Sequence, residues 1–112
     1  MFDVYIADDE RIFREYLKTV INWQDYGFRL AGEAKNGQEL VDLVDKKRAD
    51  IIFADINMPE LDGLLAAEII HKKYNDIIIV LVTGYNEFEY ARRAIGIGVN
   101  DFILKPFRKD EL

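Results

Sequence analysis

The polar residues best suited to chemistry in this 112-residue chain each follow a run of apolar residues. Asp8 and Asp9 follow the first run, Asp55 the third, Thr83 the fourth and Lys105 the fifth. If these runs are parallel strands, the five side chains meet at one edge of a sheet, because the carboxyl ends of such strands share one crevice where ligands bind. Three carboxylates, a hydroxyl and an ammonium group would then face one another.

Grouped carboxylates require a neutralising cation. Two ionised carboxylates ~5 Å apart repel by about 3 kcal/mol at an effective dielectric of ~20. Oxygen ligands without nearby histidine or cysteine suit a hard ion, and few carboxylates with open positions favour Mg²⁺. A competing interpretation is that Asp8 and Asp9 cap the following helix, a position that aspartate favours. Capping would not explain why Asp55 and Lys105 arrive at the same edge.

Asp55 has the surroundings of a nucleophile. A carboxylate between a metal ion and a cationic side chain can attack phosphorus and form an aspartyl phosphate. Mg²⁺ would neutralise two oxygens of the incoming group, Lys105 would pair with another, and the Thr83 hydroxyl would donate to the third. Pro59 and Gly63 fix the turn that follows Asp55.

The elements that position these residues alternate along the chain. Five apolar runs rich in Ile, Val and aromatic residues predict strands, and the stretches between them carry apolar residues at helical spacing. This alternation predicts an α/β sandwich, a parallel sheet with helices on both sides. The expected strands are residues 2–7, 29–34, 51–54, 77–82 and 101–104, and the helical patterns cover residues 12–20, 40–44, 64–69 and 88–95.

Composition narrows the class of protein further. A net charge of −6, from 21 acidic and 15 basic residues, argues against direct nucleic-acid contact by this domain. The absence of cysteine excludes disulfide scaffolds, thiol nucleophiles and iron-sulfur sites, and favours the cytoplasm. The longest apolar run, residues 77–82, is far shorter than the roughly 20 residues that span a bilayer, so we expect no membrane segment.

Two segments fall outside the regular alternation. Residues 22–28 contain the only tryptophan and are expected to form a surface lid whose aromatic side chains complete the core. After the last strand, Lys105-Pro106 breaks the chain, and residues 108–112 look like the first turn of a fifth helix. Because helices average about 11 residues, we expect residues 1–112 to be one domain truncated at its C-terminus.

The ordered motifs resemble the receiver domain of two-component response regulators, over the whole chain apart from the fifth helix. Each motif alone is weak, but together, each at its expected strand end, they are highly specific. The resemblance implies a flavodoxin-like (βα)5 fold with strand order 2-1-3-4-5. The matching motifs are Ala7-Asp-Asp-Glu10, Asp55-Ile-Asn-Met-Pro59, Leu61-Asp-Gly63, Val82-Thr-Gly84 and Asp101-Phe-Ile-Leu-Lys-Pro106.

The resemblance also implies a role for each site residue. Asp55 accepts a phosphoryl group from a sensor histidine kinase and, with the Asn57 main-chain carbonyl, joins the Mg²⁺ site. Asp9 is the direct metal ligand, whereas Asp8 acts through water. The domain would catalyse only its own phosphorylation and slow dephosphorylation.

The same resemblance implies a conformational switch formed by Thr83 and Phe102. The hydroxyl turns toward the phosphoryl group and the ring moves inward, which alters the face made by the fourth helix, the fifth strand and the fifth helix. That face can also serve as a homodimer contact. The peptide between Lys105 and Pro106 is commonly cis in this family.

A narrower likeness points to receivers that carry an AraC-type helix-turn-helix output domain. It rests on Ile21-Asn-Trp23, on Tyr26-Gly-Phe28 and on the stretch Gly84-Tyr-Asn-Glu-Phe-Glu-Tyr-Ala91. A C-terminal DNA-binding domain would then follow in cis, and the function would be transcription regulation. Gly84 departs from the commoner pattern, in which alanine follows the switch threonine.

Two other classes of protein compete with this interpretation. A Mg²⁺-dependent phosphohydrolase could also use Asp55 as nucleophile, but such enzymes usually carry a second carboxylate at the position of Asn57. Turnover of small phosphate esters would favour that class. A receiver-like interaction module without phosphate chemistry would bind its partner regardless of Asp55→Asn, and the intact set of polar residues argues against it.

Overall fold

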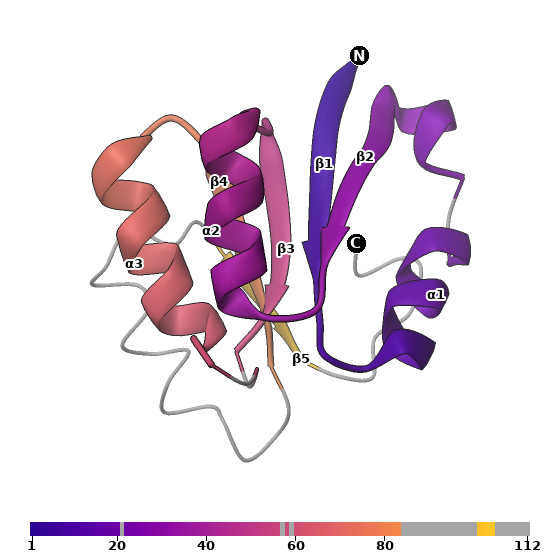
Figure 1. The fold of residues 1–112 in the computed structure, drawn as a ribbon. Coiled ribbons are helices and arrows are strands. Elements are labelled where there is room, and N and C mark those ends of the chain that lie inside the picture. Colours follow the sequence, from indigo (N-terminus) through magenta and orange to yellow (C-terminus); the bar gives the residue numbers. More distant parts are fainter. Residues whose placement is uncertain (21, 57, 59, 84–100, 105–112) are drawn as a thin grey trace.

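The protein folds as a parallel five-stranded sheet between two layers of helices (Figure 1). The computed structural model describes residues 1–20, 22–56, 58, 60–83 and 101–104. Both the predicted α/β class and the strand order β2-β1-β3-β4-β5 are confirmed. The elements are β1 (Phe2–Ala7), α1 (Arg11–Thr19), the 3-10 helix η1 (Trp23–Tyr26), β2 (Phe28–Ala34), α2 (Gly37–Lys46), β3 (Ile51–Asp55), α3 (Gly63–Lys73), β4 (Ile78–Thr83) and β5 (Asp101–Leu104).

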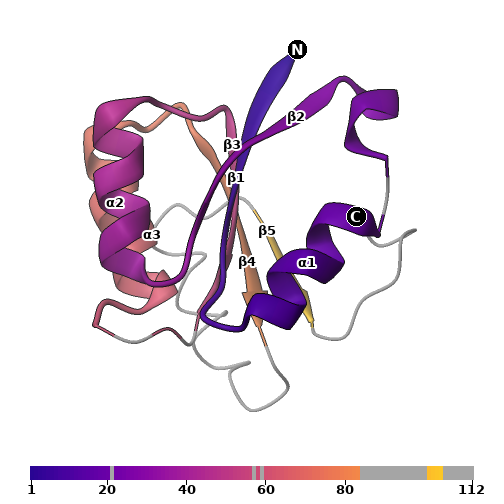
Figure 2. The ribbon, with the colours of Figure 1, turned by 45° about the vertical axis from the view of Figure 1, so that its right-hand side comes forward.

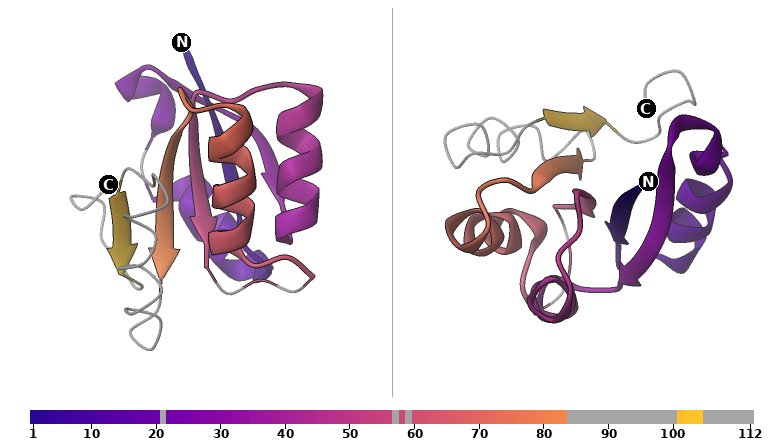
Figure 3. Two further views of the ribbon diagram at one scale, coloured as in Figure 1. Left: turned by 90° about the vertical axis from the view of Figure 1, so that its left-hand side faces the viewer. Right: turned by 90° about the horizontal axis from the view of Figure 1, so that it is seen from above.

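The helices are divided between the two faces of the sheet. α1 lies on one face, and α2 and α3 lie on the other (Figure 2). In the views along and above the sheet, β5 lies beside β4 at the side opposite β2 (Figure 3). Because helices cover both faces, the central strands bury apolar residues in both directions, as parallel strands usually do.

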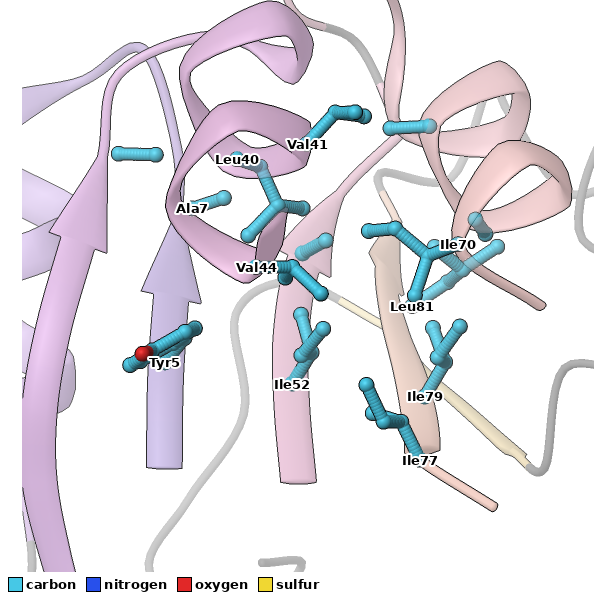
Figure 4. Packing of buried hydrophobic residues seen from close by; sticks show 14 of the residues in the cluster. Tyr5, Ala7, Leu40, Val41, Val44, Ile52, Ile70, Ile77, Ile79 and Leu81 are labelled. Atoms are coloured by element: carbon cyan, nitrogen blue, oxygen red, sulfur yellow. The ribbon is translucent and has the colours of Figure 1, made fainter. Parts of the chain in front are cut away.

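The larger core lies between the sheet and the α2–α3 layer (Figure 4). Both helices begin with a side-chain cap: Asn36 Oδ1 accepts from the Glu39 amide at 2.8 Å, and Asp62 Oδ1 accepts from the Leu65 amide at 2.8 Å. These caps satisfy amides that the first helical turn leaves without an internal partner. The fully buried side chains of this core include Leu40, Val44, Ile52, Ile70, Ile79 and Leu81.

The second core lies beneath α1 and contains the tryptophan of the predicted lid. Trp23 is only 6% exposed, and its indole Nε1 donates to the Leu17 carbonyl at 2.9 Å. Its ring meets Phe53 edge-on, with 5.5 Å between centroids. The prediction that aromatic residues of this segment complete the core is therefore confirmed for Trp23, whereas Tyr26 is 59% exposed.

The strand boundaries differ slightly from the sequence-based ones. β3 and β4 each extend one residue further, because Asp55 pairs with Val82 and Thr83 pairs with Leu104 in the backbone ladders. A polar side chain does not prevent main-chain pairing, so hydrophobicity alone ends these strands too early. The expected helical pattern of residues 88–95 and the helix start at residues 108–112 lie outside the described residues. In the part of the chain that the structure describes, no helix is long and apolar enough to cross a membrane.

Candidate functional site

An acidic cluster formed by Asp8, Asp9 and Glu10 lies directly after β1. One carboxylate oxygen from each residue lies within 4.8 Å of the others. Asp8 is 1% exposed, while Asp9 and Glu10 face solvent. Asp8 and Asp9 were expected here, but Glu10 was not among the expected metal ligands. Its place in an unbroken run of three carboxylates was the sequence signal that could have identified it.

Asp55 lies on the strand next to this cluster. It is the last residue of β3 and is 4% exposed. β1 and β3 are paired so that Ala7 lies opposite Ala54, and Asp8 and Asp55 therefore follow on neighbouring strands at the same edge. The predicted convergence of these two acidic positions is thus a property of the observed backbone register.

Capping of α1 does not account for the acidic residues. The N-cap position of α1 is Glu10, and it has no side-chain capping hydrogen bond. Asp8 Oδ1 instead accepts from the Glu10 amide at 2.9 Å, a contact that shapes the turn before the helix. The N-cap residue of α1 is therefore neither Asp8 nor Asp9, the two capping candidates from the sequence.

The turn that carries the acidic cluster is attached to β2 by a basic side chain of α1. Arg14 Nη1 donates to the Asp8 carbonyl at 2.7 Å, and Arg14 Nε donates to Glu33 Oε1 at 3.0 Å. Lys18 forms a second ion pair with Glu33. The hydrogen bond from Lys18, followed by that from Arg14, lowers the pKa of the Glu33 carboxyl despite its partial desolvation.

The loop after Asp55 is held by close main-chain contacts at two glycines. A Cβ atom on Gly63 would lie 2.0 Å from the Asp55 carbonyl oxygen, and one on Gly37 would lie 1.9 Å from the Leu61 carbonyl oxygen. The Gly63 amide also donates to the Ile56 carbonyl at 2.7 Å. The start of α3 therefore lies directly against the end of β3, which fixes the main chain of Asp55.

The remaining predicted residues are placed only in part. Thr83 ends β4 at the same edge as Asp55, and Phe102 pairs with Leu81 in β5, but their side chains are not among those described. Lys105 follows β5 directly in the sequence. Asn57, Lys105 and Pro106, with the predicted cis peptide, lie outside the described residues.

The donor atoms suit a hard divalent cation. The acidic cluster and the neighbouring Asp55 supply only carboxylate oxygens, the ligand type that Mg²⁺ prefers. Mg²⁺ held by few carboxylates keeps coordination positions for water or a phosphoryl oxygen. The residues therefore fit the ion that the sequence predicts.

The strand order 2-1-3-4-5, with acidic residues at the carboxyl edge of the sheet, defines a flavodoxin-like α/β protein, a class that binds ligands at this edge. The family profile described as the response regulator receiver domain matches residues 4–112, and the chain belongs to this family. Receiver domains act in phosphorylation-based signalling, and this role applies to the chain as a member.

Related proteins are regulators of transcription. The chain is 32% identical over 112 residues to the uncharacterized transcriptional regulatory protein YesN of Bacillus subtilis, covering 100% of this chain and 30% of YesN. It is 39% identical over 107 residues to the transcriptional regulatory protein HptR of Staphylococcus aureus, covering 95% of this chain and 41% of HptR. The chain thus spans less than half the length of these curated relatives.

Solved structures of receiver domains share the fold of this chain. The REC domain of AraT, a response regulator from Geobacillus stearothermophilus, superposes with a TM-score of 0.93 at 36% identity, covering 98% of this chain and 85% of that one. The receiver domain of NtrX from Brucella abortus gives a TM-score of 0.84 at 28% identity, covering 97% and 90% of the two chains.

Proposed function

We propose that this receiver domain is a switch in which Asp55 accepts a phosphoryl group from a sensor histidine kinase. The observation that carries the proposal is a buried aspartate at the end of β3, on the strand next to the acidic cluster of β1. A carboxylate oxygen of Asp55 attacks phosphorus, and the bond from phosphorus to the donor nitrogen breaks, returning its electron pair to the kinase histidine.

The other residues of the edge divide the supporting roles. Asp8, Asp9 and the Asn57 carbonyl hold Mg²⁺ together with Asp55, and the ion supplies neutralising charge to the phosphoryl oxygens when bound. Lys105 pairs with a further phosphoryl oxygen, and the Thr83 hydroxyl donates to the third. The domain catalyses its own phosphorylation and slow dephosphorylation. Thr83 and Phe102 transmit the phosphorylated state to the face made by the fourth helix, β5 and the fifth helix.

The domain passes this state to a C-terminal DNA-binding output domain of the AraC type, in a cytoplasmic regulator of transcription. The names of YesN and HptR support a transcriptional role, and their greater length leaves room for an output domain. The acidic charge of this chain supports DNA contact by the output domain and not by the receiver. The homodimer contact lies on the face of the fourth helix, β5 and the fifth helix.

Wild-type protein incubated with acetyl phosphate and Mg²⁺ is expected to gain one phosphoryl group, and Asp55→Asn none. Intact-mass analysis before and after hydroxylamine, which cleaves acyl phosphates, measures this. Asp50→Asn is the matched control, because Asp50 precedes β3 at the opposite end of the strand and is exposed. An equal adduct on Asp55→Asn would show that another residue is the acceptor.

Saturating Mg²⁺ is expected to raise the melting temperature. At ten times its dissociation constant, a ligand specific for the folded state stabilises by about 1.4 kcal/mol, which corresponds to several degrees in a domain of ~100 residues. Asp55→Asn should reduce this shift because it removes a ligand charge. Differential scanning calorimetry at constant ionic strength, with Na⁺ replacing Mg²⁺ as control, measures it. An unchanged melting temperature would contradict the metal site.

A further inference from the structure

The Arg14 side chain joins the turn of the acidic cluster to the neighbouring edge strand through two hydrogen bonds. Its Nη1 donates to the Asp8 carbonyl at 2.7 Å, and its Nε donates to Glu33 Oε1 on β2 at 3.0 Å. The side chain of Arg14 is only 14% exposed. A guanidinium group suits this task because its donors are fixed in one plane.

Hydrogen bonds hold both the main-chain amide and the main-chain carbonyl of Asp8. The Asp8 amide donates to the Ala34 carbonyl of β2 at 3.0 Å, and the Asp8 carbonyl accepts from Arg14. The side-chain Oδ1 of Asp8 accepts from the Glu10 amide at 2.9 Å. The Asp8 main chain is therefore tied to β2 twice, directly at the Ala34 carbonyl and through the link from Arg14 to Glu33.

We propose that Arg14 is a positioning residue for the metal site. Its guanidinium group, held by Glu33, fixes the Asp8 carbonyl and so sets the geometry of the acidic cluster for Mg²⁺. The inference rests on the proposed function, since it assigns a support residue to the same site. Lys18 forms an ion pair with the second carboxylate oxygen of Glu33, Oε2, whereas the hydrogen bond to the Asp8 carbonyl comes from Arg14.

If Arg14 acted only through its charge, its removal would strengthen Mg²⁺ binding, whereas a positioning role predicts weaker binding. Removing a positive charge beside three carboxylates would make the site more negative and would tighten Mg²⁺ binding, by about twofold for a partly screened interaction. Loss of positioning weakens binding instead, and support residues behind metal ligands typically contribute roughly 10-fold to 100-fold in affinity. The sign of the change therefore distinguishes the two roles.

The test measures the Mg²⁺ dissociation constant by isothermal titration calorimetry and the melting temperature without Mg²⁺. Arg14→Met is expected to raise the dissociation constant by roughly 10-fold. Arg14→Lys keeps the charge but loses the planar fork, so it is expected to raise the constant by more than twofold. Lys18→Met is the matched control: it removes a cation from Glu33 without touching Asp8, and it should change the constant by less than about twofold.

A double-mutant cycle with Glu33→Gln tests whether the two residues act as one unit. If Arg14 acts through its contact with Glu33, the double variant should bind Mg²⁺ no more weakly than Arg14→Met alone. An unchanged or lower dissociation constant in both Arg14 variants, with tight binding by wild type, would overturn the positioning role. Absence of Mg²⁺ binding by the folded wild type would refute the proposed function itself, and the inference with it.

Discussion

Gly63→Ala is expected to lower the free energy of unfolding by about 3 kcal/mol and to impair phosphorylation at Asp55. The added Cβ would lie 2.0 Å from the Asp55 carbonyl oxygen and 2.8 Å from its carbonyl carbon. Both are main-chain atoms, which cannot rotate away as the end of a long side chain can. α3 would have to shift from β3, and overpacking of this kind costs ~1–3 kcal/mol or more.

Gly27→Ala is the matched control for this variant. Gly27 has a φ of 81°, yet nothing lies within 4 Å of a Cβ placed there. Its substitution therefore carries only the cost of left-handed backbone, about 1 kcal/mol. Urea unfolding of both variants gives the comparison, with phosphorylation by acetyl phosphate as the functional measure. Equal losses of stability would show that close approach at Gly63 is unimportant.

Trp23→Ala is expected to lower the free energy of unfolding by about 3–5 kcal/mol. The substitution removes a 6%-exposed indole, and with it the edge contacts to Phe53 and Phe28. It also removes the hydrogen bond to the Leu17 carbonyl. Because that carbonyl belongs to the last turns of α1, the loss extends to the docking of this helix on the sheet.

Two further variants separate the contributions of Trp23. Trp23→Phe keeps most of the apolar contact but loses the hydrogen bond, and a loss of about 1–2 kcal/mol is expected. Tyr26→Ala changes an exposed aromatic residue of the same short helix and should cost less than about 0.5 kcal/mol. Chemical denaturation followed by far-UV circular dichroism measures all three. A loss at Tyr26 as large as that at Trp23 would contradict the assignment of this core.

The described fold could largely be predicted, because its strands are apolar on both faces and its helices carry periodic patterns. The expected runs at residues 2–7 and 101–104 coincide with β1 and β5. At the other strands, single ends differ by one residue: β2 begins one residue earlier, β3 ends one later, and β4 begins and ends one later. The two later ends arise because main-chain pairing continues past Ala54 and Val82 regardless of side-chain polarity. Strand order followed only from the resemblance to receiver domains, because local patterns carry no information on which strands are neighbours.

The acidic part of the site was predictable for a different reason. Carboxylates that directly follow apolar strands are conspicuous in sequence, and parallel pairing brings those ends together. The link from Arg14 to Glu33 was not predictable, because the strand order does not say which side chain of α1 reaches which residue of β2. The contact of Gly37 with the Leu61 carbonyl likewise joins segments distant in the chain. Support residues of this kind emerge only from tertiary structure.

The strand order also has a consequence for the chain during synthesis. Once β1 has paired with β2 and β3, each later strand joins the sheet at the same side, first β4 and then β5. β4 has the sequence Ile-Ile-Val-Leu-Val-Thr, a six-residue stretch with no charge and high strand propensity, which is the composition of segments that self-associate when exposed. Until β5 has left the ribosome, one side of β4 has no partner in the sheet. The four residues of β5, which begin with the acidic Asp101, therefore shield an aggregation-prone strand as well as completing the sheet.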